Sequence, residues 1–179
     1  MQISHLIKQK SYEKIEYYLR RHPITFVPIF AVFVILLLVP VALYFLTYTL
    51  FPQLLSGPLS YPALVLFASI FYLSIYLFFY GQFIDFYLDV WIVTNDRIVD
   101  IEQHGLFSRT ISELDLYHIQ DVTVEITGFF ATIFKYGNLH VKTASNNSQI
   151  IFRDIPNPNE VRQALIQLSE NDRKFHHTN

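Results

Sequence analysis

The feature that most constrains the fold is a run of 63 residues, 22–84, that contains no Asp, Glu, Lys or Arg. A bilayer core of about 30 Å is crossed by roughly 20 apolar residues in a helix. Two segments of the run, residues 24–51 and 61–84, are long and apolar enough to do this. Three prolines and one glycine over residues 52–62 interrupt helical hydrogen bonding where the segments join. The sequence therefore predicts a transmembrane hairpin over residues 23–85.

The hairpin is expected to be an anchor, and neither a conduit nor a signal peptide. Ion and proton pathways usually need ionisable residues inside the membrane, and none lies deeper than His22 and Asp85. The apolar run begins only at Ile24, exceeds the length of a signal-peptide core and lacks a small-residue cleavage site after it. Aromatic residues gather near the presumed interfaces, as the headgroup region favours: Tyr48, Phe51, Tyr61, Phe79, Tyr80, Phe83 and Phe86.

Charge is distributed unevenly around the hairpin. Residues 1–21 contain five basic and two acidic residues, a balance of +3, whereas residues 85–179 contain eight basic and thirteen acidic ones, a balance of −5. Arg20 and Arg21 directly precede the first span, and positive charge favours the cytoplasmic side. We therefore expect a multi-pass protein of the cell (inner or plasma) membrane with both termini in the cytoplasm. The chain contains no cysteine, which excludes disulfides and thiolate metal sites.

Residues 1–22 are expected to form a basic amphipathic juxtamembrane segment. Their apolar residues fall roughly on one helical face, which suits a short helix lying on the anionic inner leaflet. Two alternatives are an extension of the first span and a strip that docks on the soluble domain. The apolar residues concerned are Ile3, Leu6, Ile7, Ile15, Tyr18 and Leu19.

From residue 86 to about 170 the pattern changes to short alternating runs separated by turns, which predicts an antiparallel sheet. Six strands are expected, over residues 89–93, 97–102, 110–116, 121–127, 139–144 and 149–155, with a polar hairpin tip at 145–148. Residues 128–135 form an aromatic insert of one or two helical turns. We expect its phenylalanines to plug the core, with a membrane wedge as the alternative, and Trp91 to pack in the core. These phenylalanines are Phe129, Phe130 and Phe134.

A C-terminal amphipathic helix is the clearest local signal. Asn157, Pro158 and Glu160 stand where a cap, a first helical residue and a capping-box acid belong. The apolar residues that follow recur at helical spacing: Val161, Ala164, Leu165 and Leu168. Residues 171–179 are expected to be a disordered tail.

Several short motifs, in their order and spacing, resemble the bacterial pleckstrin-homology-like (PH-like) domain family. They are Arg21-His22-Pro23, Val93-Thr94-Asn95-Asp96-Arg97-Ile98-Val99, Gly105, Ile119-Gln120-Asp121-Val122 within 113–122, Tyr136-Gly137-Asn138-Leu139 and Thr143-Ala144. The resemblance covers about 160 residues and includes two membrane helices before the domain. It implies an antiparallel PH-like β-barrel of two roughly orthogonal sheets, capped by the helix that begins at Pro158. It carries over no catalytic residue.

No residue is singled out as catalytic, cofactor-binding or metal-ligating. The seven histidines show no ligand spacing apart from the terminal pair, and Ser108, Ser112, Asp115 and His118 form no recognisable triad. The predicted loop between the first two strands, 94–97, carries one base and one acid, so phosphoinositide-type headgroups are not expected ligands. The domain has no basic patch for nucleic acid. The histidines are His5, His22, His104, His118, His140, His176 and His177.

These features predict a non-enzymatic protein whose hairpin anchors a cytoplasmic PH-like domain. We expect the domain to recruit or scaffold a protein partner or further copies of itself, by strand addition or in the groove beside the C-terminal helix. One alternative is an accessory subunit of a membrane transport, export or stress-resistance complex. Another is a sensor of lipid headgroups.

Overall fold

The computed structural model describes residues 10, 12–143 and 149–177 of the chain. These residues divide into two compact units. One unit is Pro23–Phe86, and the other combines the residues up to His22 with those from Tyr87 onward. The first unit is therefore an insertion within the sequence of the second unit.

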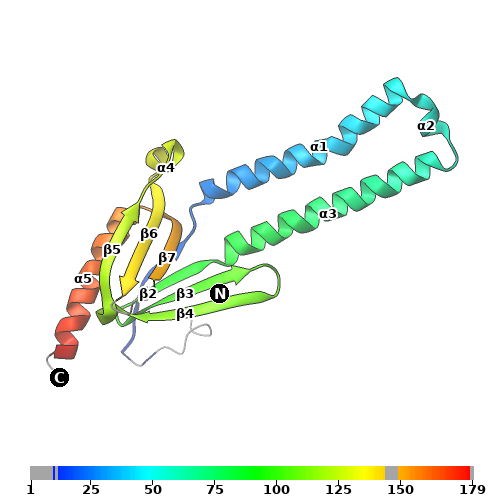
Figure 1. The fold of residues 1–179 in the computed structure, drawn as a ribbon. Coiled ribbons are helices and arrows are strands. Elements are labelled where there is room, and N and C mark those ends of the chain that lie inside the picture. Colours follow the sequence, from blue (N-terminus) through cyan, green and yellow to red (C-terminus); the bar gives the residue numbers. More distant parts are fainter. Residues whose placement is uncertain (1–9, 11, 144–148, 178–179) are drawn as a thin grey trace. The chain divides into compact units, whose positions relative to one another are not determined.

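The first unit is a helical hairpin. It contains the 3-10 helix η2 (Pro23–Phe26) and the helices α1 (Val27–Leu50), α2 (Pro52–Ser56) and α3 (Ser60–Leu88) (Figure 1). Two stretches, Pro23–Leu50 and Ser60–Leu88, are long and apolar enough to cross a membrane. The second continues to Leu88, beyond the predicted end at residue 84, because the charge of Asp85 does not interrupt the helix.

Polar side chains in the two long helices bond mostly to their own backbone. The hydroxyls of Thr47, Ser69 and Ser74 each donate to a carbonyl one turn earlier, as expected for scattered polar residues in an apolar helix. Aromatic contacts and a hydrogen bond join α1 to α3. Phe33 stacks on Phe79 with 4.1 Å between ring centroids, and Tyr72 Oη donates to the carbonyl of Leu37 at 3.2 Å.

The second unit contains two antiparallel sheets and two helices (Figure 1). The first sheet has the order β1-β2-β3-β4 and the second has the order β5-β6-β7. The described strands pair as two separate sheets, so closure into a barrel is not seen in them. The elements are β1 (Ile15–Arg20), β2 (Val90–Thr94), β3 (Arg97–His104), β4 (Ser108–Asp115), η3 (Leu116–His118), β5 (Ile119–Glu125), α4 (Phe129–Phe134), β6 (Tyr136–Thr143), β7 (Gln149–Pro156) and α5 (Pro158–His177).

Strand β1 corrects the prediction of a juxtamembrane helix over its residues. It pairs with β2 across the whole inserted hairpin, with Leu19 opposite Trp91 and Arg20 opposite Val90. Leu19 is buried in the domain core, and Tyr17 and Tyr18 suit a strand because aromatic residues pack well on a pleated surface. The alternative of a segment that docks on the soluble domain is therefore the correct one for residues 15–20. Ile3, Leu6 and Ile7 lie outside the described residues.

The six strands expected after the hairpin are confirmed, with ends shifted by a few residues. The largest shift is at β6, which begins at Tyr136 instead of residue 139. The predicted polar tip at 145–148 lies outside the described residues. Trp91 is fully buried and stacks on Phe152 at 5.6 Å, which confirms its place in the core.

Helix α5 begins at Pro158 as predicted, but its end does not match. Residues 171–177 were expected to be disordered, whereas α5 continues to His177. Ser169 and Asp172 are buried, and the Arg173 guanidinium donates to the carbonyls of Tyr117 and Ile119. These contacts to η3 and β5 hold the last turns of α5 in place. The last turns carry no apolar stripe from which the sequence could have predicted them. Residues 178–179 lie outside the described part.

Candidate functional site at the hairpin end of the domain

One end of the second unit carries both of its connections to the hairpin. Arg20, the last residue of β1, pairs with Val90, the first residue of β2. Val90 in turn pairs with Ile101, and β3 continues three residues further to His104, which pairs with Ser108 at the start of β4. The β3–β4 turn therefore lies at this same end, which we call the hairpin end.

The second sheet reaches the hairpin end through His22. The backbone N–H of His22 donates to the carbonyl of Asp154 in β7 at 2.7 Å. Its ring stacks on Tyr136, the first residue of β6, with 5.5 Å between centroids. Because α4 is joined to Tyr136 by a single residue, Lys135, this short helix also lies at the hairpin end.

Helix α4 presents its aromatic side chains to the outside. Phe129 is 74% exposed, and Phe130, Ile133 and Phe134 are also exposed, whereas Ala131 is buried. The prediction that these phenylalanines plug the core is wrong. Gly128 and Lys135 adopt positive φ angles of 104° and 54° on either side of α4. The chain turns sharply at both positions, and the helix lies beyond the ends of β5 and β6 (Figure 1).

The β3–β4 turn is a second apolar projection. Gly105 has a φ of 68°, and Gln103 Nε2 donates to its carbonyl at 2.6 Å, which fixes the turn. Leu106 is exposed and Phe107 is 99% exposed. The sequence indicates a turn at this position, but its exposed apolar surface was not predicted. Two large apolar residues in a tight turn are the signal that could have revealed it, because turns usually carry polar residues.

Basic side chains at the hairpin end are held by aromatic and acidic partners. The Arg20 guanidinium lies 5.1 Å from the ring centroid of Tyr18 and 4.8 Å from that of Tyr87. Arg21 donates to the buried carboxylate of Asp89 at 2.5 Å. Asp89 also accepts the Gln103 backbone N–H at 2.8 Å. These contacts join the residues just before the hairpin to those just after it.

Asp100 is a buried carboxyl on β3, on the same face as Glu102. Burial raises its pKa to about 7, and the negative charges of Glu102 and Asp89 add to the shift, against a smaller opposing effect of Arg153. Arg153 is 3.3 Å from Glu102, which draws it partly away from Asp100. The domain therefore contains one carboxyl that changes charge near neutral pH.

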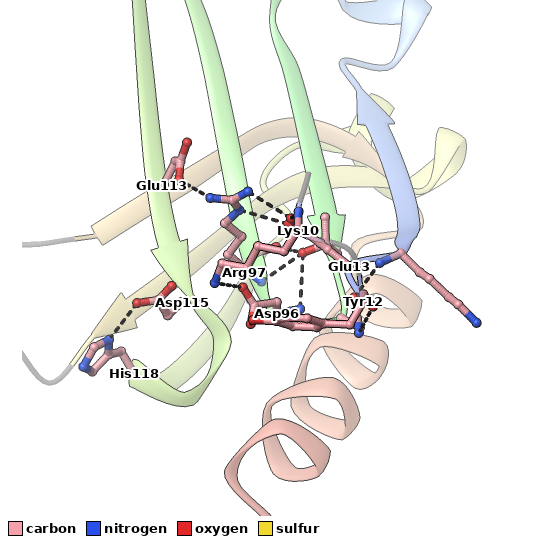
Figure 2. Close-up of polar contacts among 11 residues, drawn as sticks. Lys10, Tyr12, Glu13, Asp96, Arg97, Glu113, Asp115 and His118 are labelled. Atoms are coloured by element: carbon pink, nitrogen blue, oxygen red, sulfur yellow. Dashed lines mark hydrogen bonds and ion pairs between the residues drawn. The ribbon is translucent and has the colours of Figure 1, made fainter. Parts of the chain in front are cut away.

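The opposite end of the domain carries a network of polar contacts, shown in Figure 2. Glu13 accepts two hydrogen bonds from the Arg97 guanidinium, both at 2.9 Å, and Arg97 also donates to Glu113 at 2.7 Å. Lys10 Nζ donates to Asp96 at 2.6 Å, and Tyr12 Oη donates to the same carboxylate at 3.1 Å. The segment before the hairpin is thus fastened to the β2–β3 turn.

Electrostatics in this network favour the charged forms. Burial alone would raise the pKa of Glu13, but hydrogen bonds from Arg97 and from the Lys10 N–H outweigh it and lower the pKa. For Asp96, burial is likewise outweighed by hydrogen bonds from Lys10 and Tyr12, and its pKa is lowered. The basic side chains of Lys10 and Arg97 are therefore paired with carboxylates of the same chain.

The polar residues considered for catalysis or metal binding do not converge. His118 Nδ1 is 3.7 Å from Asp115, whereas Ser108 lies at the far end of β4 from Asp115. His104 and His140 each lie near one carboxylate, at 3.6 and 3.1 Å. Within residues 10, 12–143 and 149–177, no group of three or more potential ligands could hold a metal ion. His5 lies outside the described residues.

Comparisons with known proteins place the chain in one family. A search of curated proteins returned no match. A solved structure, of a DUF1696 family protein with a pleckstrin-homology domain from Shewanella loihica, is similar at 15% sequence identity, with a TM-score of 0.37 over 45% of this chain and 70% of that one. The family model described as "Bacterial PH domain" matches residues 15–169, a range that starts at the first residue of β1 and includes the hairpin. The chain therefore belongs to the bacterial PH domain family.

Proposed function

We propose that this protein is a membrane-anchored, non-enzymatic interaction module whose hairpin holds a PH-like domain at the cytoplasmic face of the cell membrane. The observation that carries the proposal is the insertion of two long apolar helices between β1 and β2, adjacent strands of one sheet. The domain is thereby joined to the hairpin by two chain segments, not by one flexible linker.

A lipid environment for the hairpin is supported by its exposed apolar surface. Within α1, all of which is described, no residue is buried, and within α3 only Ile75 is. Large apolar side chains are exposed along both helices, for example Leu38 and Phe45 in α1 and Leu73 in α3. An apolar surface of this extent is unfavourable in water and marks a membrane or protein contact.

The strand pairing also supports a topology with both termini on one side. Because β1 and β2 lie in the same sheet, the chain before the hairpin and the chain after it share one compartment. A hairpin that enters the membrane must then cross it an even number of times, and its two long apolar helices supply two crossings. Arg20 and Arg21 directly before the first span favour the cytoplasm as that compartment.

The edge strand β4 is the surface best suited to a protein partner. Among the described strands, β4 pairs only with β3, and its first six residues are exposed. The other sheet has two edges, β5 and β7, and both are partly occupied. Arg162 of α5 donates to the carbonyl of Val122 in β5 at 2.9 Å, and the backbone N–H of His22 donates to the carbonyl of Asp154 in β7 at 2.7 Å. A free strand edge offers unpaired backbone groups to an extended segment of a partner. The proposed role of the domain is therefore to bind such a segment along β4.

The topology is tested with a single introduced cysteine, since the chain has none of its own. We expect Gln149→Cys to react with a membrane-impermeant thiol reagent in lysed cells only. Reaction in intact cells would refute the cytoplasmic placement.

A photo-crosslinking residue at Ile111, which is exposed on β4, should form one defined adduct in membranes. The same residue at Gln149 should not. Identical adducts from both positions, or none from either, would refute β4 as the binding edge. The adduct mass separates a different protein from a second copy of this chain.

A further inference from the structure

We propose that the PH-like domain itself inserts two apolar projections, helix α4 and the β3–β4 turn, into the surface of the membrane that the hairpin crosses. The occupant of this surface is the boundary between headgroups and acyl chains, not a protein. The inference rests on the proposed function, because it takes the hairpin to be anchored in a bilayer. It adds a second, independent membrane contact made by the domain.

The position of the projections within the domain is the first support. Strand register places the β3–β4 turn beyond the Val90–Ile101 pair, at the end where the chain returns from α3. The contacts of His22 with Asp154 and Tyr136 place the start of β6, and with it α4, at the end where the chain leaves for η2. Both projections therefore share an end with the two residues that adjoin the predicted spans, His22 and Leu88.

The chemistry of the projections is the second support. Residues 126–134 contain no charge, and four of the six residues of α4 are large, apolar and exposed. The one hydroxyl in α4, of Thr132, donates to the carbonyl of Gly128 at 3.0 Å and needs no water. Phe107 is almost completely exposed at the turn. Exposed aromatic side chains are stabilised at a bilayer interface, where their faces leave water.

Charged residues surround the projections in the arrangement that an interface favours. Lys135 directly follows α4 and Arg109 directly follows the start of β4, and both are exposed. Arg20 lies between the rings of Tyr18 and Tyr87. Long basic side chains next to aromatic ones can reach anionic headgroups while the rings enter the apolar layer. At the opposite end of the domain, beside the network around Glu13 and Arg97, the exposed Tyr12 uses its hydroxyl to bond Asp96.

A bilayer fits this surface better than a second copy of the chain. The two projections come from different sheets, and both connections to the hairpin lie at the same end. A protein partner would have to fit around those connections, whereas a bilayer already meets the chain there. Lipid also accepts separated apolar tips without the shape complementarity that a protein interface needs.

The test uses the full chain, labelled at one cysteine with a nitroxide and reconstituted in nanodiscs of zwitterionic and anionic phospholipid. Collision with oxygen, which concentrates in the bilayer, is compared with collision with a neutral water-soluble nickel complex. The sites are Phe130→Cys in α4, Phe107→Cys in the turn, Leu73→Cys in α3 and Gln149→Cys at the start of β7. The fluorescence of Trp91, buried in the core, checks that each variant is folded.

We expect the ratio of oxygen to nickel collisions at positions 130 and 107 to exceed the ratio at position 149 severalfold and to lie below that at 73. A ratio at either projection equal to that at 149 would overturn the inference, since the tip would lie in water. Low collision with both reagents would also overturn it, because protein would cover the site. If the label at position 73 is itself in water, the proposal that the hairpin is a membrane anchor is refuted. This outcome separates failure of the proposed function from failure of the inference about the two projections.

Discussion

Replacement of Glu13 tests whether the segment before the hairpin is part of the PH-like fold. Its side chain is fully buried and accepts two hydrogen bonds from Arg97, which is 12% exposed. Glu113 contacts the same guanidinium but is 51% exposed. The two carboxylates are thus a matched pair around one base, and Glu13→Gln and Glu113→Gln remove the same charge from different surroundings.

The expected costs differ because burial differs. Loss of one partner from a buried ion pair costs about 3–5 kcal/mol when the other is left alone, and an exposed pair contributes roughly 0–1 kcal/mol. Arg97 keeps Glu113 when Glu13 is changed, so we expect Glu13→Gln to lower the free energy of unfolding by about 2–4 kcal/mol. The cost of Glu113→Gln should stay below about 1 kcal/mol.

The assay is urea unfolding of the full chain in detergent micelles, followed by the fluorescence of Trp91. This is the single tryptophan of the chain and lies in the domain core, so the hairpin gives no signal. With a slope of about 1–3 kcal/mol per molar urea, the Glu13 variant should unfold at a urea concentration about 0.7–4 M lower than the wild type. Equal midpoints for the two variants would refute the fastening of residues 10–20 to the domain and would favour a separate juxtamembrane segment.

Two further predictions use the same fluorescence assay. The pKa of Asp100 is raised in the folded state, so the folded protein keeps this proton to higher pH than the unfolded chain does, and the stability contributed by the neutral form is lost as pH rises from about 4 to about 7. Asp100→Asn should therefore stabilise the domain relative to wild type by about 2–3 kcal/mol more at pH 8 than at pH 5. A difference that does not depend on pH would contradict the raised pKa. Gly137→Ala should destabilise by about 1–3 kcal/mol, because its Cβ would lie 2.7 Å from the Glu125 carbonyl oxygen, whereas Gly81→Ala, with nothing within 4 Å, should leave the transition unchanged.

The strands after the hairpin could be predicted from sequence because their signals are local. In β5 and β6, apolar and polar residues alternate, and Val122, Leu139 and Val141 are buried between neighbours that are exposed or half-buried. The start of α5 is also local, at Pro158. Sequence windows of a few residues contain all the information needed for these elements.

Strand β1 could not be predicted in this way, because its partner is separated from it by the whole hairpin. Residues 15–20 contain no turn signal and pair with residues near Val90. Alone, the segment fits a helical face as well as a strand. Its conformation is decided by tertiary pairing, which local patterns do not record.

The error on α4 has a different cause. Apolar composition indicates removal from water but does not say whether protein or lipid covers the side chain. Phe129 and Phe130 were assigned to the core on that basis, yet only Ala131 of α4 is buried. In a chain with long, exposed apolar helices, the usual inference from hydrophobicity to core is weakened near the ends of those helices.

The insertion of the hairpin between β1 and β2 also sets the order in which the protein can be made. The ribosome synthesises β1 first, but both helices must follow before β2 appears. Until then Leu19 has no Trp91 to pack against, and the first sheet cannot form. Domain assembly therefore waits for the hairpin. Until β2 has been made, a nascent chain leaves the edge of β1 unpaired, and open strand edges of this kind are prone to wrong pairing. The fold thus delays completion of the first sheet until both long helices have been synthesised.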